Sequence, residues 1–307
     1  MTIHAASLSA LKADDARKTA SAILDEGSEG LALEAPLHHD AWNALRELLP
    51  RDSVKAIRLF LPYPRALRPG APSPFVAAAG GREERRAALA QAQKSLEAAA
   101  RLEAPLVLLP MTRLDIPGLS PDYMAPTDSI EGETLRLRST DGEVRTRMDS
   151  LLLLLSFLLE RAERYATTIC LTPGNRSGEL PLTPETLTCL EEFEGAPLGL
   201  WLDTCRLPGE FLRVPRIADT ASPVSGLELF DKVEGASVSD EAPGGTLCNP
   251  GEGAVPWDLI TSSLRSLPLW CVNTPAGDGL AEGLSFLGDL DGERETPGEL
   301  LDGLGLG

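Results

Sequence analysis

The sequence has few of the residues that usually mark a particular chemistry. Aromatic residues make up 5% of the 307 positions, and there are only 3 histidines and 5 cysteines. Because the cysteines are odd in number, widely spaced and never arranged as CxxC, neither a disulfide framework nor a zinc knuckle is predicted. The core must consist mainly of leucine, alanine and valine, which is feasible because 43% of the residues are hydrophobic.

Long apolar segments are also missing. The first residues, MTIHAASLSALKADDARK, contain no apolar stretch of signal-peptide length. The longest apolar run, Leu151–Leu155 followed by Phe157–Leu159, is too short to cross a bilayer. We therefore expect a cytoplasmic protein that does not bind membranes.

Basic residues are scarce in the second half of the chain. Residues 1–166 hold 21 basic and 23 acidic residues, whereas residues 167–307 hold 7 basic and 23 acidic ones. A negative field of this kind repels phosphate backbones, so no nucleic-acid partner is expected. The acidic half is interpreted either as a solvated surface that aids solubility or as a docking face for a basic protein partner.

What the sequence does contain is an alternation of short apolar runs with segments of helical spacing, repeated about eight times. Apolar runs without polar alternation are typical of parallel strands covered on both faces, and their alternation with helices predicts βαβ units. We therefore predict an α/β fold, a single-domain (β/α)8 TIM barrel. The predicted strands are Ile3–Leu8, Leu31–Ala35, Val54–Leu61, Leu106–Leu109, Ile169–Thr172, Leu198–Leu202, Ala236–Val238 and Leu269–Val272.

Four helices are placed between the first strands, at Asp14–Leu24, Asp40–Leu49, Glu83–Leu102 and residues 143–166. The last has apolar residues at alternating intervals of four and three from Val144 to Tyr165, and Thr140 with Glu143 forms a capping-box pattern before it. An alternative is a hairpin over residues 135–147 that turns at Asp-Gly and gathers four arginines on one face. Opposed like charges disfavour the hairpin, so the helix is the prediction.

Residues 1–283 are predicted to form the barrel, and two further segments stand apart from its repeating pattern. Residues 112–139 are rich in proline and follow the fourth strand, so they form either a lid over the strand ends or a disordered insertion. Residues 284–307 form an acidic, glycine-rich tail that is expected to pack weakly.

Several fragments resemble one family of barrels. Gly30–Glu34 is a glycine followed by an apolar strand that ends in glutamate, Leu198–Cys205 contains Leu-Asp-Thr-Cys, and Ser237–Asp240 precedes the glycine-rich Pro250–Gly253. In this order, they resemble the xylose-isomerase-like and endonuclease-IV-like TIM barrels, the sugar phosphate isomerase/epimerase-like proteins. The resemblance implies a barrel over most of residues 1–275.

The resemblance also implies a divalent metal at the strand ends, bound by Glu, Asp, His and Glu on the fifth to eighth strands. Such a metal polarises a carbonyl or generates hydroxide, and in the epimerases the two glutamates act as paired acid and base. In this sequence Thr172, Asp203, Ser237 and Asn273 stand at those positions, so only Asp203 is retained. Arg206 replaces the endonuclease-type histidine, and we expect it to pair with Asp203 or another mouth carboxylate. Neither a metal nor another cofactor is therefore expected.

The remaining candidate residues each have an ordinary structural interpretation. Glu34 at a strand end either binds a ligand or stabilises the barrel through hydrogen bonds. Cys205 beside Arg206 is either a nucleophile or a packed cysteine. The adjacent His38 and His39 are interpreted as polar loop residues, and Gly251–Gly253 as a tight turn instead of a phosphate-binding loop.

Three functions follow from these observations. The first is a barrel that has lost the metal-dependent reaction and binds a small polar molecule or a protein partner at its mouth without catalysis. The second is an active isomerase or epimerase acting on a sugar, polyol or hydroxy-carbonyl compound at a rearranged site, the one case that would require a divalent metal. The third, an abasic-site endonuclease, is disfavoured by the missing histidines and the acidic second half. The sequence does not determine the oligomeric state.

Overall fold

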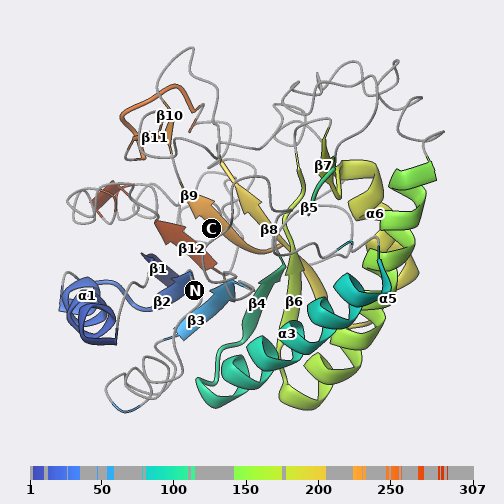
Figure 1. Cartoon of the computed structure of the whole chain (residues 1–307). Helices are drawn as coiled ribbons and strands as arrows, with labels where there is room; N and C mark the ends of the chain where they lie inside the picture. The colour runs from blue at the N-terminus through green and yellow to red at the C-terminus, as the bar shows by residue number, and fades with distance from the viewer. Residues whose placement is uncertain are drawn as a thin grey trace, which may run out of the picture.

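Eight parallel strands form a closed barrel in the computed structural model (Figure 1). The strands are β1 (Ile3–Ser9), β2 (Leu31–Glu34), β3 (Val54–Arg58), β4 (Leu106–Leu109), β6 (Thr168–Leu171), β8 (Leu198–Asp203), β9 (Val224–Leu229) and β12 (Leu269–Val272). Their order is β1-β12-β9-β8-β6-β4-β3-β2, and β1 pairs with β2 to close the ring. The prediction of a (β/α)8 barrel is therefore confirmed.

The structure describes part of the chain. The described residues are 3–9, 13–25, 27–34, 47, 54–58, 78, 81–109, 112–114, 142–174, 178–204, 224–229, 231–232, 247–248, 250–255, 257, 269–272, 283, 285–286 and 289.

Alternate residues of the strands pack on opposite sides of the barrel wall. Val107 and Leu109 of β4 belong to the large apolar cluster shared with buried helix residues such as Leu96. Leu108, between them, belongs to a second apolar cluster that includes Cys170 and lies inside the barrel. Burial on both faces explains why these strands are nearly continuous apolar runs.

Four helices are described around the barrel: α1 (Ala13–Asp25), α3 (Arg82–Arg101), α5 (Gly142–Tyr165) and α6 (Thr183–Glu192). The helices α3 and α5 lie side by side on one flank of the barrel, and α1 lies on the opposite flank (Figure 1). In α5 the buried residues, among them Leu151, Leu155, Leu158 and Ala162, follow the predicted apolar stripe. None of the described helices is long and apolar enough to span a membrane.

The predictions for α1, α3 and α5 are confirmed to within about two residues at each end. The alternative hairpin is wrong, because residues 142–147 are helical and the apolar stripe of α5 buries a complete face. The predicted capping residue Thr140 lies outside the described residues. In the predicted helix Asp40–Leu49 only Glu47 is described, and it is helical.

The prediction of the seventh strand is wrong. The seventh barrel strand is β9, and the barrel closes without residues 236–238, which lie outside the described residues. The sequence of β9, VSGLEL, carries Ser225, Gly226 and Glu228 among its apolar residues. It therefore lacks the continuous apolar run by which the other strands were recognised.

Two short antiparallel ribbons extend the sheet beyond the carboxyl ends of barrel strands. In one, β5 (Thr112–Arg113) follows β4 and pairs with β7 (Glu179–Leu180), which follows β6. In the other, β10 (Asp231–Lys232) follows β9 and pairs with β11 (Leu247–Cys248). Both ribbons lie at the upper end of the barrel in Figure 1, which is its mouth. The segment predicted as a loop over residues 112–139 thus begins with a strand; residues 115–139 are outside the described part.

Part of the predicted tail packs against the glycine-rich segment that follows β11. Phe286 is half-buried, and its ring makes an edge-to-face contact with Trp257, with ring centroids 5.0 Å apart. Phe286 also lies against Gly251, whose φ of +91° is in the left-handed region. The expectation of weak packing is therefore wrong for Phe286, whereas residues 290–307 lie outside the described part.

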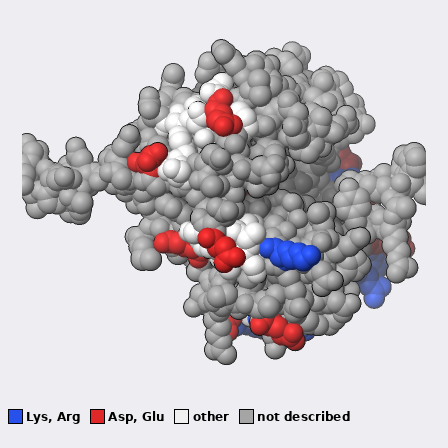
Figure 2. Space-filling view, turned by 90° about the vertical axis from the view of Figure 1, so that its left-hand side faces the viewer, with Lys and Arg blue, Asp and Glu red and all other residues white. Residues whose placement is uncertain are grey.

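On the face of the molecule that Figure 2 shows, the described acidic side chains form several separate spots. Asp25, Glu29 and Glu252 are exposed and belong to different segments. This scatter is typical of a solvated acidic surface. The docking of a basic partner stays a prediction.

Candidate functional site

The residues predicted for the site are only partly described. Asp203 ends β8 and is half-buried, and Thr172 directly follows β6 and is 8% exposed. Glu34 ends β2, where its backbone is in register with Ser9 of β1. Because the carboxyl ends of parallel strands meet at one end of a barrel, these three positions lie around the mouth.

The other predicted positions lie outside the described residues. They are Cys205, Arg206, Ser237, Asn273, His38 and His39. The role given to Ser237, as the replacement of a histidine on the seventh strand, is wrong because residue 237 is not on that strand.

The mouth residue of the seventh strand is Glu228, which the sequence analysis missed. Glu228 is in register with Asp203 on β8 and with Cys271 on β12, so its backbone lies between these two strands. The backbone N–H of Thr204 donates to the carbonyl of Glu228 at 3.0 Å and ties the two strand ends together. The structure therefore brings two carboxylates, Asp203 and Glu228, to adjacent positions at the mouth.

The carboxylate of Glu228 is turned toward the barrel interior and is 1% exposed. The indole Nε1 of Trp201, itself fully buried, donates to Glu228 Oε2 at 3.0 Å. A buried carboxylate must be hydrogen-bonded to stay stable, and the indole N–H supplies one such bond. Trp201 therefore fixes the orientation of the Glu228 side chain below the mouth.

The indole of Trp201 fills the interior only because the neighbouring strand has no side chain at Gly226. A Cβ atom at Gly226 would lie 2.2 Å from Cζ3 of Trp201. The apolar cluster around the ring consists of Ala32, Leu108, Cys170 and Cys271, with Leu106 partly buried against it. The described floor of the site is thus mainly apolar, and the carboxylate of Glu228 bonds to its edge through the Trp201 indole.

Two of the described thiols, those of Cys170 and Cys189, are buried and structural. Burial raises the pKa of the Cys170 thiol to about 12, although a side-chain hydrogen bond with Ser225 works in the opposite direction. Burial also raises the pKa of Cys189 to about 12, and the nearby charge of Glu185 adds to this effect. Because the thiolate is the reactive form, neither cysteine is a nucleophile at neutral pH.

A buried carboxylate, Asp231, organises the loop beside the mouth. Its oxygens accept hydrogen bonds from the backbone N–H groups of Gly251 at 3.1 Å and Val255 at 3.0 Å, and from Trp257 Nε1 at 2.8 Å. The glycine-rich segment thus already surrounds an internal anion. This supports its interpretation as a tight turn, since the N–H of Gly251 is directed to Asp231.

Glu179 and Thr112, on the ribbon β5–β7, are also buried, at 2% and 1% exposure. The Thr112 hydroxyl accepts a hydrogen bond from the backbone N–H of Ala78 at 3.1 Å. Neither residue was expected from the sequence, because two-residue ribbons leave no periodic pattern.

The described residues do not match the metal ligands that the resemblance implies. The fifth, sixth and seventh strands offer Thr172, Asp203 and Glu228 where the resemblance implies Glu, Asp and His. The described part of the chain holds no group of three or more His, Cys, Asp or Glu that could bind a metal ion. One oxygen of Glu228 is, moreover, already the acceptor of the Trp201 indole.

Comparison with known proteins finds relatives in structure but not in sequence. No protein-family model and no curated protein matches the chain. A D-tagatose 3-epimerase-like protein matches with a TM-score of 0.64 and 16% identity over 94% of this chain and 96% of that chain. The 3-keto-D-glucoside 4-epimerase from E. coli matches with a TM-score of 0.62 and 14% identity, over 94% of this chain and 100% of that chain.

The AP endonuclease of family 2 from Brucella melitensis is similar as well, with a TM-score of 0.61 and 16% identity over 96% of this chain and 100% of that chain. Identities this low show the fold alone. The chain has the fold of the xylose-isomerase-like TIM barrels, a fold that includes sugar isomerases and epimerases as well as AP endonucleases. The resemblance noted in the sequence is thereby confirmed.

Proposed function

We propose that this protein binds a small polyhydroxylated compound, such as a sugar or polyol, at the mouth of the barrel without the metal-dependent chemistry of its structural relatives. The observation that carries the proposal is the half-buried Asp203 at the mouth, next to the buried Glu228, whose carboxylate is held by the Trp201 indole. An ionised carboxylate accepts hydrogen bonds from hydroxyl groups, and such bonds are stronger than those between two neutral groups.

The change in the donor set supports a binding role without metal. Thr172 brings a hydroxyl, which is a weak ligand for a divalent cation, to the end of the fifth strand. Glu228 is held by an indole N–H at the seventh strand, where the resemblance implies histidine. In this proposal, Arg206 supplies the positive charge near Asp203, which keeps the carboxylate ionised.

A second candidate function is an isomerase or epimerase with a rearranged site. It is favoured by the neighbouring carboxylates Asp203 and Glu228, because carboxyl groups close to one another can serve as general acid and base. Structural relatives named as D-tagatose, D-allulose and 3-keto-D-glucoside epimerases favour it too.

A third candidate function is the binding of a protein partner at the mouth, because the loops at the strand ends of barrels often serve such contacts.

The test combines metal analysis with binding. Purified protein is dialysed, its divalent metals are measured by mass spectrometry, and the binding of D-tagatose and D-allulose is measured by calorimetry. We expect far less than one metal ion per chain and measurable binding. The variant Asp203→Asn is expected to weaken that binding by about tenfold, the effect of one charged hydrogen bond.

The matched control is Glu163→Gln, which removes an exposed carboxylate on α5 outside the candidate site and is expected to leave binding unchanged. A stoichiometric metal ion that Asp203→Asn releases would contradict the proposal. Formation of an epimer from either ketose, detected by chromatography, would favour the second candidate instead.

A further inference from the structure

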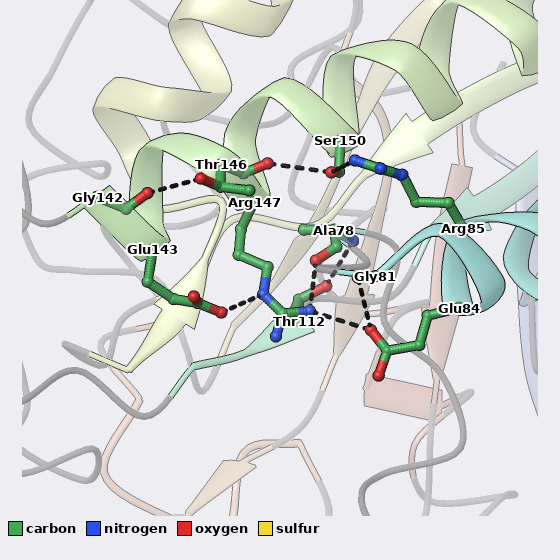
Figure 3. Close-up of polar contacts among 10 residues, drawn as sticks. All are labelled: Ala78, Gly81, Glu84, Arg85, Thr112, Gly142, Glu143, Thr146, Arg147 and Ser150. Atoms are coloured by element: carbon green, nitrogen blue, oxygen red, sulfur yellow. Dashed lines mark hydrogen bonds and ion pairs between the residues drawn. The ribbon is translucent and has the colours of Figure 1, made fainter.

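An arginine on α5 joins three segments at the rim of the mouth. The segments are the end of the connection from β3 to α3, represented by Ala78 and Gly81, the beginning of the connection from β4 to α5 at Thr112, and the first turns of α5 itself. In Figure 3 the guanidinium of Arg147 points between the first two of these.

The contacts of Arg147 reach beyond its own helix. Its Nη1 donates to the carbonyl oxygen of Ala78 at 3.1 Å and lies 3.6 Å from Glu84 Oε2 on α3. Its Nε donates to Glu143 Oε1 at 2.7 Å, one turn earlier on α5. The Arg147 side chain is only 20% exposed, so these bonds are partly shielded from water.

The partners of Arg147 are themselves tied to the neighbouring segments. The N–H of Ala78 donates to Thr112 Oγ1, and the N–H of Gly81 donates to Glu84 Oε2 at 3.2 Å. Ala78 is fully buried, so its carbonyl oxygen requires a donor, and Arg147 provides one. Removal of the guanidinium therefore leaves a buried carbonyl without this bond and a carboxylate without its cation.

We propose that Arg147 is a positioning residue that fixes the ends of the connections after the third and fourth barrel strands to α5, so that this side of the rim moves as one unit. A second effect, on ligand affinity, rests on the proposed function, because the rim surrounds the mouth where the sugar or polyol binds. A guanidinium suits the task because its fork donates to acceptors on different elements at once.

The chain offers a matched control on the same helix. Arg164 forms an ion pair with Glu160 at the same i,i+4 spacing, but this pair is 69% and 60% exposed. No bond from the Arg164 side chain to another element is described. An effect seen at Arg147 and absent at Arg164 therefore reflects the tie between segments and not the loss of a helical ion pair.

The test is amide hydrogen exchange in the full-length protein, compared between wild type, Arg147→Met, Arg147→Lys and Arg164→Met. We expect the amides of Ala78 and Gly81 to exchange about tenfold faster in Arg147→Met, because one charge-assisted hydrogen bond is lost locally. Arg147→Lys is expected to restore part of the protection. The amides of β4 and β6 should be unchanged in every variant, which separates local opening from global destabilisation.

Unchanged exchange at Ala78 and Gly81 in Arg147→Met, or an equal increase in Arg164→Met, would overturn the proposal. If Arg147→Met does not fold, Thr112→Val provides the second test, because it removes the acceptor of the Ala78 N–H and should expose the same amide. D-tagatose affinity is measured in parallel at a temperature well below unfolding. Faster exchange in Arg147→Met together with no ketose binding by the wild-type protein would support the role of Arg147 and contradict the proposed function.

Discussion

The indole N–H of Trp201 and the carboxylate of Glu228 are joined by a 3.0 Å hydrogen bond inside the barrel. Trp201 comes from the sixth barrel strand and Glu228 from the seventh, and the two side chains are 0% and 1% exposed. In a site of low dielectric, a charged acceptor depends strongly on each of its donors. The bond therefore both closes the floor of the mouth and orients one of its two carboxylates.

Trp201→Phe should lower the free energy of unfolding by about 1–3 kcal/mol. The substitution removes the indole N–H that donates to the buried carboxylate of Glu228, while the phenyl ring keeps part of the apolar packing. The measurement is urea unfolding at neutral pH. Tyr165→Phe, a change of an exposed aromatic residue on α5, is the control and should change the free energy by less than about 0.5 kcal/mol. Equal stability of the two variants would show that the indole N–H is not needed.

Gly226→Ala should destabilise the protein by about 1–3 kcal/mol, because the new Cβ atom would lie 2.2 Å from the buried Trp201 ring and the core must shift. Thermal unfolding is the measurement. Gly142→Ala is the matched control, since nothing lies within 4 Å of its Cβ position at the start of α5. Because alanine is the better helix former, we expect the control to be neutral or slightly stabilising.

The fold could be predicted from the sequence because strands buried on both faces appear as short, continuous apolar runs. The strand Leu106–Leu109 was predicted with its exact bounds, and the helical stripe around Leu155 identified α5. The signal fails in β9, where Ser225 and Glu228 interrupt the apolar residues. Residues distant in sequence, Cys170 and Trp201, form hydrogen bonds with them, which helps to stabilise these polar groups in the buried strand.

The candidate site was less predictable, because it depends on contacts between residues that are distant in the sequence. Asp203 was assigned through the family resemblance of Leu198–Cys205, but its neighbour Glu228 follows from strand pairing, which no local pattern encodes. The contact between Trp201 and Glu228 joins positions 27 residues apart, and it depends on the register of β8 and β9. Arg147 was seen only as one of four arginines in the alternative hairpin, and its contacts with Ala78 depend on the packing of α3 against α5.

Asp231→Asn should loosen the loop beside the mouth. The carboxylate accepts from two backbone N–H groups and from the Trp257 indole through both oxygens, whereas an asparagine offers one oxygen and turns an N–H₂ toward the other donors. We expect a loss of about 1–3 kcal/mol in unfolding free energy and faster amide exchange at Gly251 and Val255. Unchanged exchange at both amides would mean that Asp231 does not hold this loop.

The buried thiols predict a loss of stability in alkaline solution. Cys170 and Cys189 have an ordinary thiol pKa of 9.0, and burial raises both to about 12 in the folded protein. A folded pKa above the unfolded value means that folding favours the neutral thiol. The resulting contribution is present in full below pH 9 and is lost as the pH rises toward 12, by up to about 1.4 kcal/mol per pH unit for each thiol.

Urea unfolding at pH 8 and at pH 10, with a reducing agent present, measures this dependence. Other groups titrate in the same range, so the comparison that matters is between wild type and Cys170→Ala. The variant should be less stable at pH 8, because it leaves a small cavity beside Trp201, but should lose less stability on the way to pH 10.

In the native protein at pH 8, neither Cys170 nor Cys189 should react with iodoacetamide, and both should react once urea unfolds the chain. Rapid alkylation of Cys170 in the native state, or an identical pH dependence in Cys170→Ala, would contradict its burial inside the barrel.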